Sequence, residues 1–343
     1  VGFLIVTIYC VAGGFLAAAW TDMFQGTVML LCLVCLPIVA FISMENFQTI
    51  YSGLERMEPS LVSFWGSGGL NLLNASVVLG MALIGLGFLG SPQVFARLIA
   101  IKSESEIRRG RWVALLFTIL VDFSAVSIGI LGRYLFVGQG ADPETLLGNG
   151  AQNVLSEMVE FTFPSWVVGL YVAAVLAAIM STVSSLLVMA SGSITHDLYA
   201  RIYNPDMSDK NATRFCRLIT IVMAVAALGI SMTVALLSPD RTIFWFAVFG
   251  WSGIAATFCP MIILSLFWPK FTERGAIASM LTGFLMTLVS KFLLQEIDDI
   301  GIYFSALETM PPSFLSALLL GYVVSILWPD RELERNYSSE LAQ

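Results

Sequence analysis

The sequence is poor in charge and in the side chains that usually perform chemistry. Only 12% of its 343 residues are charged, and it has one histidine and five cysteines. A soluble domain carries about 25% charged residues, so the scarcity of charge argues against that class. No nucleophile, base and acid set, no cluster of metal ligands and no basic nucleic-acid patch is visible. We therefore expect neither an enzyme nor a cofactor nor a nucleic-acid partner.

The five cysteines fall within or at the ends of apolar stretches, where neither a disulfide framework nor a thiolate metal cluster is expected. We interpret them as reduced, small packing residues. They are Cys10, Cys32, Cys35, Cys216 and Cys259.

Long apolar runs make up most of the chain, and hydrophobic residues account for 57% of it. Nine runs approach or exceed the roughly 20 residues that cross a bilayer, and they lack the alternation of membrane strands. We expect an all-α integral membrane protein with nine transmembrane helices in one domain, residues 1–330, and a short tail, residues 331–343. The runs cover 1–20, 23–43, 73–100, 111–136, 164–190, 213–237, 242–268, 275–295 and 311–328.

Basic residues predict the orientation of these helices. Most of the 17 Lys and Arg residues lie in alternate loops, at 97–111, 201–217 and 270–274, and in the tail. The positive-inside rule assigns these segments and the C-terminus to the cytoplasm, so we expect a multi-pass protein of the cell membrane. Val1 begins inside an apolar run without an initiator Met or a signal-peptide pattern, so we expect further sequence upstream.

One apolar run carries a stripe of hydroxyls. On a helix, Ala178, Ser181, Thr182 and Ser185 follow the i, i+3, i+4, i+7 spacing and share a face, with Ser184 beside them. Oxygen ligands of this kind suit a small alkali cation. The alternative is close packing against a neighbouring helix, with the hydroxyls bonded to their own helix.

Two other runs contain Gly and Pro where a lipid-facing helix should be regular. They are 80–92, with Gly80, Gly85, Gly87 and Gly90 before Ser91-Pro92, and 250–260, which contains Gly250, Gly253 and Pro260. Such interruptions in secondary transporters mark unwound segments that contact ligands. Ordinary Gly-mediated helix packing is the alternative.

Four motifs in order resemble the sodium:solute symporter family, most closely its sodium/proline symporters. They are Gly13–Ala17 leading to Trp20-Thr21-Asp22 and Gln25, Gly85–Pro92 with Arg97, Leu176–Thr182 leading to Asp197-Leu198-Tyr199, and Trp251-Ser252-Gly253 with Pro260. The resemblance implies the inverted-repeat, leucine-transporter-like fold, with the run 1–20 as the fourth core helix and 164–190 as the eighth. Three core helices would then lie upstream of Val1.

The resemblance also implies a function and ion sites. The function is sodium-coupled uptake of a small organic solute, most simply proline or a related amino acid, by alternating access. The Ala178 carbonyl and the Ser181 and Thr182 hydroxyls would bind the main sodium ion, and Na+ is the only metal expected. A possible second sodium site would use Asp22, Ser181, Ser184 and Ser185. Asp22 also has an alternative role as the N-cap of the helix that follows it.

The implied solute-binding residues are Ile84, Phe88, Ser91, Pro92, Trp251 and Ser252. Proline symporters carry an aromatic residue at the position of Ile84 and a tyrosine at that of Phe88. The replacements change the pocket volume and remove a hydroxyl, which puts proline specificity in doubt.

Asp122 lies near the middle of the run 111–136, where an unpartnered charge costs at least about 2.5 kcal/mol. We expect it to be protonated, paired or beside water, and it is a candidate coupling residue.

Three other interpretations of the whole chain stay open: a symporter for pantothenate or a short carboxylate, a symporter-like sensory module, and an inactive fragment. The expected partners are a small solute, sodium and the lipid bilayer.

Overall fold

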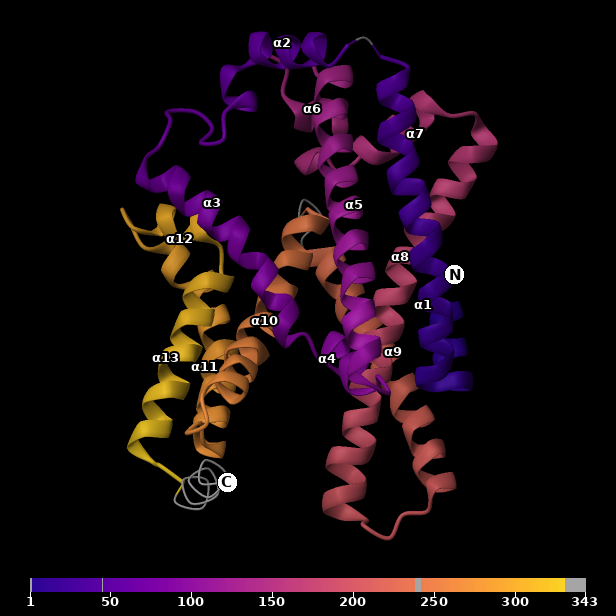
Figure 1. Cartoon of the computed structure of the whole chain (residues 1–343), viewed down its shortest axis with the longest axis vertical. Coiled ribbons are helices and arrows are strands. Elements are labelled where there is room, and N and C mark those ends of the chain that lie inside the picture. Colours follow the sequence, from indigo (N-terminus) through magenta and orange to yellow (C-terminus); the bar gives the residue numbers. More distant parts are fainter. Residues whose placement is uncertain (1, 45, 238–241, 331–343) are drawn as a thin grey trace. The chain divides into compact units, whose positions relative to one another are not determined.

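The structure is a computed structural model of the chain and describes residues 2–44, 46–237 and 242–330. Within these ranges the regular elements are all helical (Figure 1). The predicted tail, 331–343, lies outside the described residues. The chain forms two compact units, Val1–Met57 with Ala100–Thr242 (unit 1) and Glu58–Ile99 with Ile243–Gln343 (unit 2).

Unit 1 contains the hydroxyl stripe. Its elements are α1 (Gly2–Ile42), α2 (Phe47–Met57), α5 (Glu104–Phe136), α6 (Pro143–Leu147), η3 (Asn149–Ala151), α7 (Val154–Thr162), α8 (Ser165–Gly192), η4 (Ser193–Tyr203) and α9 (Asp209–Leu237). The π-helical η4 continues directly from α8. Val6 and Cys10 of α1 form a buried core with Leu187 of α8 and Ala224 of α9.

Helix α1 is a hairpin of two helical segments, residues 2–13 and 15–42, joined at Gly14. Gly14 alone within α1 has a non-helical backbone, with φ 54° and ψ −141°. Cys10 Sγ lies 3.9 Å from the Ser184 carbonyl oxygen, and Asp22 Oδ1 lies 3.3 Å from Ser184 Oγ. Twelve residues of straight helix would separate Cys10 from Asp22 by about 18 Å. Both can reach Ser184 only because the chain doubles back between them.

The hairpin corrects the predicted spans. The chain turns at Gly14, not in the polar stretch between 20 and 23, so the first predicted run ends early and the second begins early. Eight helices in the described part of the chain are long and apolar enough to cross a membrane when α1 is counted once. The two segments of α1 correspond to the first two of the nine predicted runs.

We expect Gly14→Ala to destabilise the protein by about 1–3 kcal/mol, because L-residues strongly disfavour a positive φ with this ψ. The Cβ itself would meet no atom within 4 Å, so the effect isolates backbone strain. Thermal unfolding of the purified protein in detergent measures it. Gly129→Ala is the matched control, since Gly129 lies in regular α5 with equally open space. Equal melting temperatures for the two variants would contradict the assignment of the turn.

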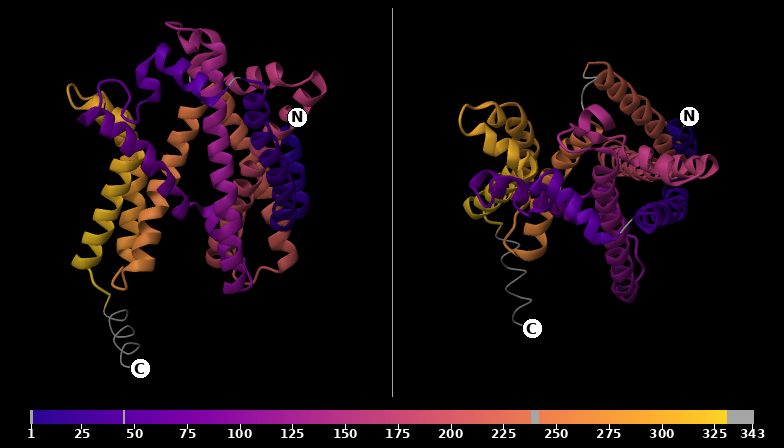
Figure 2. Two further views of the ribbon diagram at one scale, coloured as in Figure 1. Left: turned by 45° about the horizontal axis from the view of Figure 1, so that its top comes forward. Right: turned by 90° about the horizontal axis from the view of Figure 1, so that it is seen from above.

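Unit 2 contains η1 (Pro59–Val62), α3 (Leu72–Ile84), η2 (Gly85–Gly90), α4 (Pro92–Ile99), α10 (Ile243–Phe267), α11 (Glu273–Phe292), η5 (Leu294–Glu296), α12 (Gly301–Leu307) and α13 (Met310–Leu327). Helices α11 and α13 run side by side (Figure 2). Small residues permit this approach: a Cβ on Gly321 would lie 2.8 Å from that of Ser279. Close contact through small residues is the usual way in which membrane helices associate.

Candidate functional site

The predicted main sodium ligands converge on one carbonyl of α8. Ser181 Oγ donates to the Ala178 carbonyl oxygen at 3.1 Å, and Thr182 Oγ1 donates to the same oxygen at 3.3 Å. Ser181 is half-buried, whereas Thr182 is exposed within the described chain. These bonds are the ones that the packing alternative predicts. They also place three hard oxygen atoms together, as a cation site requires.

The residues of the possible second site meet across two helices. Asp22, in the second segment of α1, accepts from Ser184 Oγ at 3.3 Å and from Ser185 Oγ at 3.2 Å, one bond to each carboxylate oxygen. Both hydroxyls also lie 2.9 Å from the Ser181 carbonyl oxygen. A hydroxyl has a single proton to share between two acceptors. A carboxylate, two hydroxyls and a carbonyl thus lie together where α1 meets α8.

The alternative role of Asp22 as an N-cap is wrong. The helical segment that contains Asp22 begins directly after Gly14, so Asp22 lies about two turns inside it. The backbone N–H groups near Asp22 already donate to carbonyls of the same helix. Its carboxylate accepts hydrogen bonds from two serines of α8 instead.

Tyr9 also belongs to this cluster, although the sequence pattern does not predict it as a site residue. Its hydroxyl donates to the Met180 carbonyl oxygen at 3.2 Å and lies within reach of the side chains of Thr21, Gln25 and Ser184. The Oε1 atom of Gln25 is buried without a hydrogen-bond partner among the described residues. Tyr9 reaches the cluster only through the hairpin at Gly14, which hydropathy does not reveal. The adjacent glycines 13 and 14 were the one available signal.

The interrupted helix predicted in unit 2 is present at 85–92. Helix α3 ends at Ile84, η2 is a tighter 3-10 segment, and Ser91 is extended before α4 begins at Pro92. Proline disfavours a helical residue before it, which accounts for the break at Ser91. The second predicted interruption, at 250–260, is wrong: α10 is one continuous helix with Pro260 inside it.

The predicted solute residues fall into two groups. Phe88 is 58% exposed and packs on Trp251, with ring centroids 4.8 Å apart at 55°. The indole N–H of Trp251 donates to the Ile84 carbonyl oxygen at 3.2 Å. Ser91 and Ser252 are fully buried, and the Ser252 hydroxyl donates to the Val248 carbonyl of its own helix at 2.8 Å. The Ser91 hydroxyl has no hydrogen-bond partner in the described part of the chain.

Asp122 belongs to neither cluster. Its side chain is exposed on α5, next to the exposed Phe123. Its role as a coupling residue stays a prediction.

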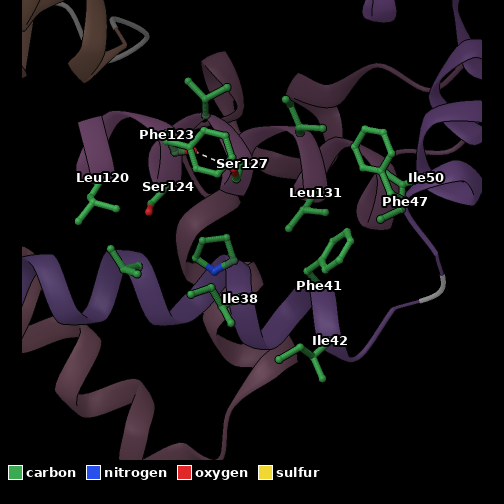
Figure 3. A pocket seen from close by; sticks show the side chains of 14 residues that line it. Ile38, Phe41, Ile42, Phe47, Ile50, Leu120, Phe123, Ser124, Ser127 and Leu131 are labelled. Carbon is green, nitrogen blue, oxygen red and sulfur yellow. Dashed lines mark hydrogen bonds between the residues drawn. The ribbon is translucent and has the colours of Figure 1, made fainter. Parts of the chain in front are cut away.

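An apolar groove of about 610 Å³ lies between α1, α2 and α5 of unit 1 (Figure 3). Its polar lining consists of Ser124 and Ser127, and Ser127 Oγ donates to the Phe123 carbonyl oxygen. None of its lining residues belongs to the predicted sodium or solute sites. With no charged lining residue, the groove offers no partner to an ion or an amino-acid zwitterion.

A family model for the sodium:solute symporter family matches residues 1–283. The chain belongs to this family. The sodium/proline symporter 2 of Staphylococcus saprophyticus subsp. saprophyticus is 32% identical over 331 residues, which is 94% of this chain and 60% of the relative. The high-affinity proline transporter PutP of Bacillus subtilis is 31% identical over 94% of this chain and 63% of its own length. This family member thus spans about three fifths of the length of these relatives.

A solved structure shares the fold of this symporter-family chain. It is the substrate-bound, outward-open state of a Na+-coupled sialic acid symporter, which superposes with a TM-score of 0.68 over 96% of this chain and 66% of the other, at 17% identity. The expected all-α, leucine-transporter-like membrane fold is thereby confirmed.

Proposed function

We propose that the full-length protein couples the entry of sodium to the uptake of a small organic solute, most simply proline or a related amino acid. The observation that carries the proposal is the meeting of Asp22 with Ser184 and Ser185, next to the Ala178 carbonyl and its two hydroxyl partners. The named functions of the sodium/proline relatives support the choice of ion and solute. A multi-pass location in the cell membrane, with the C-terminus in the cytoplasm, follows from the basic loops.

The chain's own oxygens define the ion chemistry. The Ala178 carbonyl with Ser181 and Thr182 forms the main site, and Asp22 with Ser181, Ser184 and Ser185 forms the second. Hydroxyl and carbonyl oxygens replace part of the hydration shell of a monovalent cation, and the carboxylate offsets its charge. Each sodium that enters contributes about 2.3 kcal/mol per 100 mV of membrane potential, in addition to its concentration ratio. Because the second site joins α1 to α8, sodium bound there would stabilise one arrangement of these helices over another.

The solute site is proposed at the interrupted helix of unit 2. Phe88 and Trp251 form an aromatic surface beside Ile84. The Ser91 hydroxyl, which has no hydrogen-bond partner among the described residues, lies at the break before Pro92. Ser252 is retained as a solute residue, although its hydroxyl is bonded within α10. Phe88 offers no hydroxyl to a carboxylate or an amine, so shape and apolar contact carry more of the recognition here.

We expect cells that make the full-length protein to accumulate radiolabelled proline at least tenfold faster in sodium buffer than in choline buffer, because the gradient drives each cycle. Initial uptake rates measure this. Unlabelled pantothenate, acetate and other amino acids serve as competitors that separate the alternative cargoes. Equal uptake in the two buffers would contradict sodium coupling. Sodium-dependent uptake of one of the other cargoes in radiolabelled form, without uptake of proline, would replace proline as the solute.

A further inference from the structure

The 3-10 segment η2 is held in place by donors from α10. The indole N–H of Trp251 reaches the Ile84 carbonyl oxygen at 3.2 Å, just before η2 begins. The thiol of Cys259 reaches the Leu86 carbonyl oxygen at 3.0 Å, within η2. Hydrogen bonds inside a 3-10 turn have poorer geometry than those of an α-helix, so donors from a neighbour matter more there.

The face of α10 that carries these donors fits closely against η2. Trp251, Ala255 and Cys259 are four residues apart and form one ridge of the helix. A Cβ on Gly87 would lie 2.7 Å from that of Ala255, and a Cβ on Gly90 would lie 2.2 Å from the backbone nitrogen of Cys259. The two glycines therefore let the ridge approach near enough for both hydrogen bonds to form.

The ridge of α10 also packs against α13. Ala255 and Cys259 form a buried cluster with Met310 and Phe314 of α13, and neither Cys259 nor Met310 has measurable exposure. The donors therefore sit on a rigid support, which is the arrangement that holds a binding site to its geometry.

We propose that Trp251 and Cys259 are positioning residues of the solute site, which hold the carbonyls of Ile84 and Leu86 so that Phe88 and Ser91 keep their binding geometry. The inference rests on the proposed function and adds Cys259, which the sequence indicates only as a packing residue. It also changes the role of Trp251: the indole N–H is already bonded to the backbone, so its ring, and not its N–H, contacts the solute. Phe88 packs on that ring and stays exposed on its other side.

Two variants of Cys259 in the full-length protein test the role. Cys259→Ser retains a donor and is expected to keep KM for proline within about twofold of wild type. Cys259→Ala leaves the Leu86 carbonyl without this donor and is expected to raise KM about tenfold, with little change in maximal rate per molecule. Cys35→Ala, at an exposed cysteine of α1, is the matched control. At saturating proline, the sodium concentration for half-maximal uptake should stay the same in all three variants, because none of them changes a predicted ion ligand.

A second measurement does not depend on transport. Hydrogen exchange of backbone amides at 85–92 in the purified protein should be faster in Cys259→Ala than in wild type, and Cys259→Ser should restore the wild-type rate. If alanine and serine behave alike in both KM and exchange, or if alanine lowers only the amount of protein in the membrane, the positioning role is overturned. Failure of the wild type to transport proline with sodium would refute the proposed function instead, and the exchange result would still decide this inference.

Discussion

Full-length protein with Asp22→Asn is expected to need on the order of a hundredfold more sodium for half-maximal uptake. Asp22 is the one carboxylate of the cluster, and its two oxygens are each bonded to a serine hydroxyl of α8. An amide keeps the size of the side chain but removes the charge and turns one oxygen into a donor. The loss of a charged ligand in a poorly solvated site costs about 2–3 kcal/mol, which corresponds to the expected shift.

The control for this variant is Asp142→Asn. Asp142 caps α6 in the same unit and accepts from the Glu144 backbone N–H, far in sequence from the proposed ligands. It should change the sodium dependence less than twofold. A sodium requirement that stays at the wild-type value in Asp22→Asn, with normal protein in the membrane, would remove Asp22 from the ion site.

Gly90→Ala is expected to abolish most uptake and to destabilise the protein by about 3 kcal/mol. The new Cβ would lie 2.2 Å from the backbone nitrogen of Cys259 and 2.3 Å from its Cα, and backbone atoms of α10 cannot swing aside. Relief requires that η2 and α10 move apart, which breaks the hydrogen bond from Cys259 to Leu86. Overpacking of this kind commonly costs 1–3 kcal/mol, and a contact with backbone lies at the upper end.

Gly85→Ala provides the comparison within the same 3-10 segment. Its Cβ would meet nothing within 4 Å, and its φ of −62° suits any L-residue. Uptake should stay within about twofold of wild type and the melting temperature should change little. Similar losses in both variants would show that η2 tolerates no side chain for reasons other than contact with α10.

Local spacing was sufficient to predict that the proposed ion ligands of α8 share one face, because that arrangement depends on a single helix. Ala178, Ser181, Thr182, Ser184 and Ser185 share a face of α8 at the expected helical period. The break before Pro92 was predictable for the same reason, since Gly and Pro act on their own backbone. The contacts that complete these features are long-range, such as the one from Asp22 to Ser185, and followed only from the family resemblance.

The predicted helix boundaries are wrong where polar or helix-breaking residues have a role other than ending a helix. Thr21 and Asp22 resemble a loop between two apolar runs, but they lie inside a helix and Asp22 faces α8. Pro260 resembles an interruption, but it is buried within continuous α10. The bond from Cys259 to the Leu86 carbonyl could not be predicted, because it depends on how closely two helices approach. Such local conflicts are expected at functional sites.

The proposed function depends on sodium binding to oxygens of α8. Equilibrium binding of radioactive sodium to the purified full-length protein, with choline as the balancing cation, measures this. The wild type should show saturable binding, and the double variant Ser181→Ala with Thr182→Ala should lose most of it while its melting temperature without sodium stays near that of wild type. Identical saturable binding in the two proteins would show that these hydroxyls only pack α8 against its neighbours, and the account would be wrong.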